Sequence, residues 1–204
     1  MNFLSRSTLV VAAVLASSAF AGEWTLDPAH SAAQFSVKHM MVSTVRGEFQ
    51  KVSGTVSVDE KDVTKSKVNV TIDPASINTR QEKRDEHLRS ADFFDVAQFP
   101  TMTFASTKVQ KGKGGKLKVT GDLTMHGVTK PVTLDVESLS KPIKNPWGQT
   151  VRGFSATGKL NRKDFGLNWN KGLEAGGVLV GDEISLQIDG ELNEAAPAPA
   201  AAGK

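Results

Sequence analysis

Residues 117–136, LKVTGDLTMHGVTKPVTLDV, carry the clearest structural pattern in the chain. Apolar or small residues alternate with polar ones up to the pair His126-Gly127, and the alternation resumes after it. A period of two is typical of a β-strand with one buried face, and a turn between two such runs indicates a hairpin. Pro131 cannot donate a hydrogen bond to a neighbouring strand, so we expect an edge or a bulge there. This stretch therefore predicts two antiparallel strands.

Similar alternation recurs along most of the chain. It is plain in residues 184–192, and residues 54–59 and 66–73 are expected to form a second hairpin. Residues 39–42, HMMV, interrupt the pattern and predict a single helical turn. Roughly eight strands joined mostly by hairpins favour an antiparallel barrel or sandwich over a parallel sheet. The remaining strands are expected at residues 23–26, 33–38, 45–49, 101–109 and 149–160.

Glycines inside the predicted strands favour a barrel over a sandwich. Strands that close on themselves must bend sharply, and glycine or a bulge allows the bend. We therefore predict a mainly all-β fold, in which an antiparallel barrel of eight strands carries one helical insertion. The glycines concerned are Gly121, Gly153, Gly158 and Gly190.

The helical insertion is predicted at residues 79–100, TRQEKRDEHLRSADFFDVAQFP. Thr79 followed three residues later by Glu82 fits a capping box, which marks the start of a helix. The residues that follow are charged on nearly every face, so the helix needs an anchor, and Phe93 and Phe94 are expected to supply it. Two interpretations stay open: a solvated connecting helix held by two phenylalanines, or a lid over a cavity.

The first residues of the chain predict export. Arg6 precedes an apolar run at residues 8–16, which is shorter than the roughly 20 residues of a transmembrane helix. Residues 19–21, AFA, fit the small-residue pattern of a signal-peptide cleavage site. We therefore expect residues 1–21 to be a signal peptide that is cleaved after Ala21, and the mature protein to be periplasmic.

The last residues of the chain have a different composition from the rest. Residues 194–204, EAAPAPAAAGK, contain almost nothing to bury, and segments of this kind stay disordered. Residues 22–193, about 170 in number, suit one domain with its own core. We therefore predict a single barrel domain between the signal peptide and a disordered Ala/Pro tail.

Composition excludes several classes of protein. The chain has no cysteine, so it has neither disulfides nor a lipidated cysteine. Removing Arg6 with the signal peptide lowers the basic count from 25 to 24, against 22 acidic residues. The two signs are interspersed rather than clustered. We therefore expect no nucleic-acid partner.

No residue pattern indicates catalysis. The sequence has no G-x-S-x-G motif, no H-E-x-x-H motif and no cysteine nucleophile. Its histidines lack paired metal-ligand spacing, so we expect no metal site, no cofactor and no enzymatic activity. The histidines are His30, His39, His87 and His126.

The interior of the predicted barrel could be packed or hollow. An eight-stranded barrel is just wide enough to be filled by side chains or to hold one small or slender ligand. Many inward positions are small, which favours a hollow apolar barrel, but periodicity does not distinguish the two. For the hollow barrel we predict a tunnel lined by Phe35, Val37, Phe49, Phe94, Met102, Phe104 and Gly121.

Several motifs, in order, resemble those of the YceI-like family of exported bacterial proteins. The resemblance covers nearly all of residues 24–192 and implies an extended, lipocalin-like barrel. It further implies a carrier, not an enzyme, whose tunnel holds a polyisoprenoid or isoprenoid quinone ligand, with transient membrane contact. The motifs are DPAHS (27–31), FSVKHM (35–40), RDEHL (84–88), FFD (93–95), FP (99–100), GDLT (121–124), GVTKPV (127–132) and NRKDFG (161–166).

A second function class stays open beside the carrier. It is a stress-related periplasmic structural or interaction protein, whose barrel is packed and holds no ligand.

A polar group is expected at the mouth of such a tunnel, because the polar end of a prenyl chain should not be buried unpaired. Arg84 and His87 share one stripe of the predicted helix, and we hypothesise that they border the entrance. The alternative is that Arg84 only pairs with a carboxylate and pins the helix. Farther along the chain, Arg162 and Asp164 are expected to form a structural ion pair.

Overall fold

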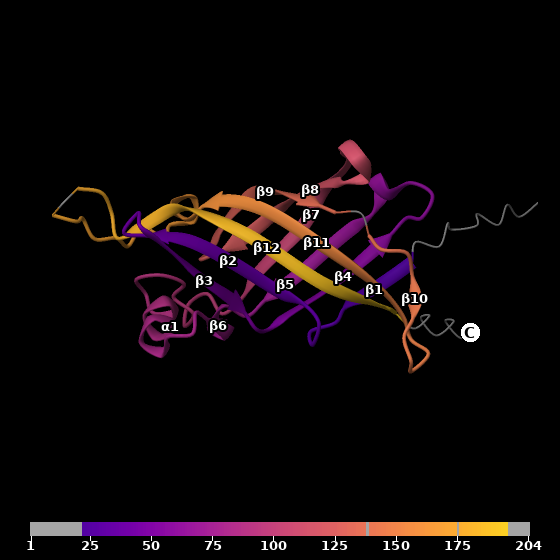
Figure 1. Cartoon of the computed structure of the whole chain (residues 1–204), viewed down its shortest axis with the longest axis horizontal. Helices are drawn as coiled ribbons and strands as arrows, with labels where there is room; N and C mark the ends of the chain where they lie inside the picture. Colours follow the sequence, from indigo (N-terminus) through magenta and orange to yellow (C-terminus); the bar gives the residue numbers. More distant parts are fainter. Residues whose placement is uncertain (1–21, 138, 175, 196–204) are drawn as a thin grey trace, which may run out of the picture.

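The computed structural model describes residues 22–195, apart from residues 138 and 175. The predicted signal peptide and residues 196–204 of the predicted tail lie outside the described residues. The described part holds one α-helix, α1 (Glu82–Arg89), and the 3-10 turns η1 (Val63–Lys65), η2 (Pro74–Ser76), η3 (Lys113–Gly115) and η4 (Arg162–Phe165). Its strands are β1 (Gly22–Leu26), β2 (Ala32–His39), β3 (Ser43–Phe49), β4 (Val52–Val58), β5 (Lys67–Ile72), β6 (Ile77–Asn78), β7 (Met102–Lys111), β8 (Leu117–Met125), β9 (Val128–Val136), β10 (Ile143–Lys144), β11 (Thr150–Asn161) and β12 (Val180–Glu194) (Figure 1).

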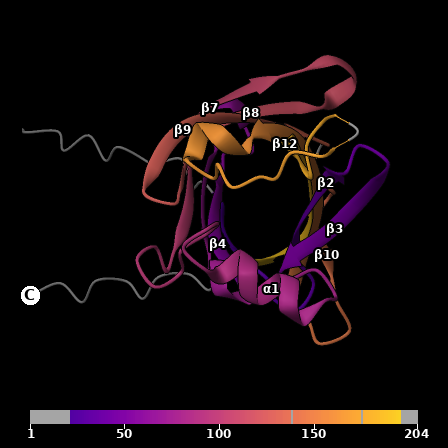
Figure 2. The ribbon, with the colours of Figure 1, turned by 90° about the vertical axis from the view of Figure 1, so that its left-hand side faces the viewer.

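Eight of these strands close into an antiparallel barrel, which confirms the predicted fold class. The order round the barrel is β11-β9-β8-β7-β5-β4-β1-β12, and β12 pairs with β11 to complete the ring. The β11–β12 pairing runs from Val151 opposite Asn193 to Asn161 opposite Glu183. Figure 2 looks into the barrel from the end at which α1 lies. The inward faces of the eight strands therefore surround one interior.

Two strands share one edge of β12, and this arrangement lengthens the barrel. β1 pairs with the last part of β12, around Leu192, whereas β2 pairs with the earlier part, from Val180 to Asp189. β3 pairs with β2, and its end, at Glu48 and Phe49, pairs with the short β6. The β2–β3 hairpin therefore extends the barrel toward α1 (Figure 1).

The clearest sequence pattern is confirmed as the β8–β9 hairpin, whose strands pair along their full lengths. At the turn, His126 (φ 52°) and Gly127 (φ 73°) are both left-handed. Two consecutive left-handed residues match a tight turn to the twist of the strands. Pro131 lies where β9 pairs with β8 alone, because β11 pairs with β9 only at residues 134–136. The predicted edge at this proline is confirmed.

The helical turn predicted at residues 39–42 is wrong. Met40 (φ 52°) and Met41 (φ 64°) are left-handed and reverse the chain between β2 and β3, with His39 paired to Ser43 across the turn. The Met40 amide also donates to the Leu179 carbonyl oxygen at 2.8 Å. Turns of this kind usually contain glycine, asparagine or aspartate, so two methionines gave no local signal for it.

The helical insertion is confirmed, but its predicted cap is wrong. Gln81 caps α1, because its side-chain oxygen accepts the Arg84 amide at 2.6 Å. Thr79 is buried, and its hydroxyl donates to Asp85 Oδ1 at 2.5 Å. The Thr79 side chain therefore bonds to a carboxylate and does not cap the backbone amides at the start of the helix.

Within the described residues, no helix is both long enough and apolar enough to cross a membrane.

Alternation along the strands places the apolar side chains inside. In β7, Met102 and Phe104 are buried, while Thr103 and Ala105 are exposed. The main core cluster lines the inside of the barrel, and a smaller cluster around Trp24 lies toward the end opposite α1 (Figure 1). The barrel wall therefore has an apolar inner face and a polar outer face.

Candidate ligand-binding tunnel

An apolar cavity of about 200 Å³ lies inside the barrel, and all eight strands of the closed ring contribute to its wall. Its lining is hydrocarbon, thioether or aromatic except at Gln34 and Ser66. Such a cavity offers shape and hydrophobic contact, with Gln34 and Ser66 as its two polar side chains. The predicted tunnel residues that line it are Phe35, Phe49, Met102 and Phe104.

Three predicted tunnel residues, Val37, Phe94 and Gly121, lie outside this lining. Phe94, in the segment after α1, packs edge-on against Phe49 with the ring centroids 5.5 Å apart. Val37 pairs with Val45 and Ile184 near the end of β2. Ligand contact by Phe94 or Val37 stays a prediction that requires the cavity to extend toward α1.

Gly121 supports the wall without facing open space. A Cβ atom at this position would lie 2.7 Å from Phe104 Cε2 and 2.6 Å from the Ala105 carbonyl oxygen. The aromatic ring therefore occupies the place that a side chain at residue 121 would take. Gly121 shapes the tunnel wall by leaving room for the Phe104 ring beside β8.

Sequence reasoning missed much of the wall formed by the β8, β9, β11 and β12 strands. These residues sit at the inward positions of strands that the alternation did predict. The same signal could have found them, had it been followed through each strand. They include Leu134, Ala156, Leu160, Leu186 and Ile188.

The start of α1 is held by a buried network rather than by an ion pair. Arg84 Nε donates to Thr79 Oγ1 at 2.7 Å, and Arg84 Nη2 donates to the Thr79 carbonyl oxygen at 2.8 Å. Asp85 Oδ1 accepts the Thr79 amide at 2.9 Å. Arg84 thus pins the helix through a hydroxyl and a carbonyl, and its predicted contact with a ligand stays a prediction.

His87 joins α1 to the loop that follows η4. Its Nε2 lies 2.8 Å from Asp92 Oδ2. Its ring meets Phe93 and Trp169 edge-on, with centroids 5.1 Å and 4.8 Å away. These three rings form an aromatic cluster at the α1 end of the barrel, which is where the predicted mouth would lie. Contact between His87 and a ligand stays a prediction.

Arg162 connects the loops at the same end of the barrel. It is buried, and it donates to the carbonyl oxygens of Leu167, Trp169 (2.9 Å) and Gly181 (3.0 Å). Its carboxylate partner is Asp182, at 3.2 Å, so the expected pair with Asp164 is wrong. Burial lowers the pKa of the Arg162 guanidinium, and Asp182 opposes this shift. The partners of the guanidinium lie in the loop after η4 and at the start of β12, rather than in its own turn.

Arg152 and Trp24 pack together toward the opposite end. Arg152 is buried, its Cζ lies 5.2 Å from the centre of the Trp24 ring, and its Nε donates to the Ser140 carbonyl oxygen at 2.9 Å. Its Nη1 lies 2.5 Å from Glu60 Oε1. Sequence reasoning missed this pair, because an arginine within a strand carries no signal of burial.

Asp27, His30 and Glu191 bring potential metal-ligand atoms within 4.8 Å of one another. The arrangement is accounted for by an ion pair, since His30 Nδ1 lies 2.8 Å from Asp27 Oδ2. The hydrogen bond to His30, followed by that from the Ala29 amide, lowers the pKa of Asp27. The same hydrogen bond raises the pKa of His30. These groups secure the break between β1 and β2.

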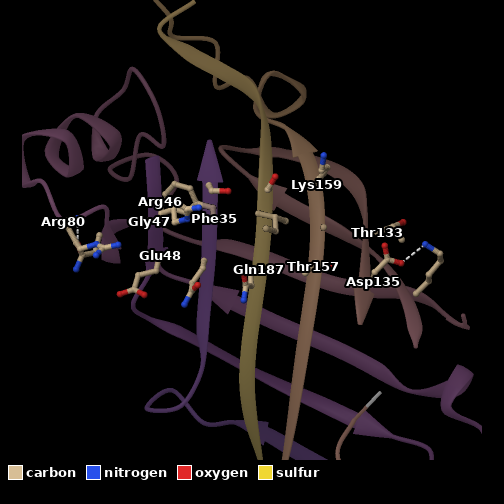
Figure 3. Close-up of a pocket in the computed structure, with 17 residues that line it drawn as sticks. Phe35, Arg46, Gly47, Glu48, Arg80, Thr133, Asp135, Thr157, Lys159 and Gln187 are labelled. Atoms are coloured by element: carbon tan, nitrogen blue, oxygen red, sulfur yellow. Dashed lines mark hydrogen bonds and ion pairs between the residues drawn. The ribbon is translucent and has the colours of Figure 1, made fainter. Parts of the chain in front are cut away.

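A larger, open groove of about 1010 Å³ lies on the outer face of the sheet (Figure 3). Its lining carries many charged, hydroxyl and amide side chains: Arg46 and Glu48 come from β3, whereas Thr157 and Gln187 come from β11 and β12. Hydroxyl, amide and charged groups of this kind do not suit a hydrocarbon chain. The inner cavity is therefore the candidate site for an apolar ligand.

A closed antiparallel ring of eight strands around an apolar cavity defines the class of lipocalin-like barrels, which can hold one slender ligand. Within that class, the chain belongs to the YceI-like family, because the profile described as "YceI-like domain" matches residues 24–192.

Similar proteins agree with this assignment. A UPF0312 protein of Staphylococcus aureus (strain MSSA476) is 41% identical over 171 residues, which cover 83% of this chain and 96% of that protein. The crystal structure of a Campylobacter jejuni YceI protein matches with a TM-score of 0.65 at 36% identity, covering 78% and 90% of the two chains. A polyisoprenoid binding domain from Saccharophagus degradans matches with a TM-score of 0.59 at 17% identity, covering 84% and 98%. This last likeness shows the fold alone.

Proposed function

We propose that this protein is a periplasmic carrier, which holds a long polyisoprenoid or isoprenoid quinone chain in the tunnel of its barrel. One observation carries the proposal: the cavity is enclosed by the closed ring of strands, and its wall is almost entirely apolar. A polar group would lose its hydrogen bonds to water there, whereas a hydrocarbon has none to lose. The site therefore favours a hydrocarbon ligand, and a binding protein over an enzyme.

Burial of the chain supplies the affinity. Each Å² of apolar surface removed from water contributes about 25 cal/mol, so a long prenyl chain can bind tightly with few polar contacts. The Saccharophagus degradans domain, which is described as polyisoprenoid binding, shares the fold of this chain. The polar end of the chain is proposed to lie near Arg84 and His87, at the α1 end.

The size of the cavity implies movement on binding. An apolar cavity of about 150 Å³ is known to hold benzene, so about 200 Å³ is too small for a long chain. Met102 and Met125 line the cavity, and unbranched methionine side chains adapt readily to a new shape. We expect the tunnel to widen as these side chains change rotamer.

The periplasmic location has its own test. The signal peptide predicted at residues 1–21 supports it, and N-terminal sequencing of the protein from the periplasmic fraction is expected to find Gly22 first. A cytoplasmic protein that still begins at Met1 would remove the basis for a carrier between membranes.

Mass spectrometry of an organic extract of the purified protein tests the ligand. A prenyl lipid in the extract is expected, and Ala156→Phe should remove it, because Ala156 lines the cavity. Ala105→Phe is the matched control, since Ala105 lies on the outer face of β7. If Ala156→Phe does not fold, Leu186→Trp fills the same cavity.

A packed barrel that acts as a structural or interaction protein is the second candidate. The small volume of the cavity favours it. It predicts an extract without prenyl lipid and no uptake of added prenyl alcohol or quinone by the wild-type protein. Those two results together would exclude the carrier.

A further inference from the structure

A hairpin at residues 141–150 exposes the largest apolar side chain on the described surface. Trp147 is 86% exposed and Ile143 is 63% exposed. A tryptophan is seldom so open to water, and its amphipathic ring is enriched where one side is apolar and the other is wet. The hairpin therefore presents an apolar tip with no partner in the described part of this chain.

Hydrogen bonds within the hairpin hold the conformation of its tip. Asn145 Oδ1 accepts the amides of Trp147 (3.1 Å) and Gln149 (3.0 Å), and the Asn145 amide donates to the Gln149 carbonyl oxygen at 2.9 Å. Gly148 is left-handed, with φ 82°. At the base, Ile143 pairs with Val151, so β10 joins the sheet. An ordered tip loses less conformational freedom on binding than a mobile loop would.

The positive charge of the hairpin favours an anionic partner. Its charged residues are Lys141 and Lys144, and residues 141–150 contain no acid. Tryptophan settles at the level of lipid headgroups, and lysines near it attract anionic lipids. Two apolar side chains on a convex tip are too few for a stable protein interface, which buries roughly 800 Å² on each partner. A bilayer requires no matching groove.

We infer that this hairpin docks the protein on an anionic lipid bilayer. Trp147 and Ile143 enter the interfacial region, and Lys141 and Lys144 contact the headgroup phosphates. The hairpin leaves the barrel at the end opposite α1 (Figure 1), so docking leaves the α1 end free. The inference does not depend on the proposed ligand, because empty vesicles suffice to test it.

The opposite end of the barrel supplies a matched control. Met41 is 61% exposed and Val42 is 82% exposed at the β2–β3 turn, so this tip is comparably apolar. It has no aromatic ring, and Met41 leans toward Gly177 of the neighbouring loop. A general attraction of apolar tips to lipid would involve both ends, whereas our inference involves only the Trp147 hairpin.

Vesicle co-sedimentation tests the inference. The chain beginning at Gly22, which holds every described strand, is used so that the apolar run at residues 8–16 does not bind lipid itself. The wild type is expected to bind vesicles that mix phosphatidylglycerol with phosphatidylcholine, and to bind phosphatidylcholine alone more weakly. Ile143→Ser with Trp147→Ser, and separately Lys141→Gln with Lys144→Gln, should each weaken binding about tenfold or more. Met41→Ser with Val42→Ser should leave it unchanged.

Fluorescence locates the contact independently. Lipids brominated on their acyl chains quench nearby tryptophan. Of the other two tryptophans, Trp24 is buried in the barrel and Trp169 packs against His87 and Phe93 at the α1 end, away from the hairpin. Quenching in the wild type should disappear in Trp147→Phe. The inference is overturned if the wild type does not bind anionic vesicles, if the hairpin variants bind as the wild type does, or if the Met41 and Val42 variant loses as much binding as they do.

Discussion

The ring of Phe104 lies against Gly121, where a Cβ atom would come within 2.7 Å of Phe104 Cε2 and 2.6 Å of the Ala105 carbonyl oxygen. Phe104 is buried and lines the tunnel, and Gly121 faces it from the neighbouring strand. The packing of this wall therefore depends on the absence of a side chain at residue 121.

Gly121→Ala is expected to destabilise the protein by about 1–3 kcal/mol, since overpacking a core moves neighbouring side chains and backbone. Gly153→Ala is the control in the same barrel, because a Cβ there would approach only the Gly190 carbonyl oxygen, at 3.9 Å. It should be neutral or slightly stabilising. Denaturant titration measures both, and equal midpoints for the two variants would show that Phe104 yields without cost.

Arg162 and Lys163 share the carboxylate of Asp182, but only Arg162 is buried. Arg162→Met should lower stability by about 3 kcal/mol or more, because it leaves the carbonyl oxygens of Leu167, Trp169 and Gly181 without their donor, while Asp182 keeps Lys163. Lys163→Met removes the surface partner of the same carboxylate and should cost about 1 kcal/mol at most. Similar losses for both variants would contradict a structural role for the buried guanidinium.

The fold was predictable because the alternation of apolar and polar residues along a strand is enough to identify its buried face. The alternation in residues 117–136 specified β8 and β9, including the unpaired edge at Pro131. Four of the seven predicted tunnel residues line the cavity for the same reason. Periodicity states which side chains face inward, but it does not state how far the cavity extends.

The two ends of the barrel were less predictable, because contacts between distant residues define them. His87 meets Trp169 across 82 positions, and Arg152 meets Glu60 across 92 positions. No local pattern encodes either contact. The left-handed Met40 and Met41 are a related case, since the pairing of β2 with β3 and the hydrogen bond to Leu179 hold a turn that their own preferences do not favour.

The Asp27–His30 pair predicts a pH dependence at the break between β1 and β2. His30 has a raised folded pKa, so its contribution is present below its usual pKa of 6.5 and is lost as the pH rises through the folded value. Asp27 has a lowered folded pKa, so its contribution is present above its usual 3.8 and is lost as the pH falls through the folded value. The pair therefore stabilises the segment between β1 and β2 most fully between the usual pKa values of 3.8 and 6.5, where Asp27 is charged and His30 is protonated.

NMR titration of the histidine ring checks this prediction. The pKa of His30 should lie above 6.5 in the wild type and return toward it in Asp27→Asn. Asp62→Asn is the control, because Asp62 accepts hydrogen bonds from Thr64 and makes no contact with His30. An unchanged His30 pKa in Asp27→Asn would show that the pair does not persist in solution.

Arg84 has a structural role at the start of α1 and a proposed role in ligand binding, and variants can separate the two. Its contacts with Thr79 hold the start of α1, and the same guanidinium is our candidate for the polar end of the ligand. A guanidinium pairs well with phosphate oxygens, so a contact at the mouth would favour phosphate-ended prenyl chains over neutral quinones. Arg84→Gln should then weaken binding of the phosphorylated lipid about tenfold and leave quinone binding nearly unchanged, because hydrogen bonds to charged groups contribute about 1.5–3 kcal/mol.

Thr79→Val is the matched variant for this experiment, because it removes the hydroxyl that anchors Arg84 and keeps the arginine charge. It should lower the melting temperature with little effect on the preference between the two lipids. If Arg84→Gln and Thr79→Val instead weaken both lipids equally and melt at similarly reduced temperatures, Arg84 only pins the helix. The polar end of the ligand would then have to be sought elsewhere along the aromatic cluster of His87, Phe93 and Trp169, which lies at the same end of the barrel.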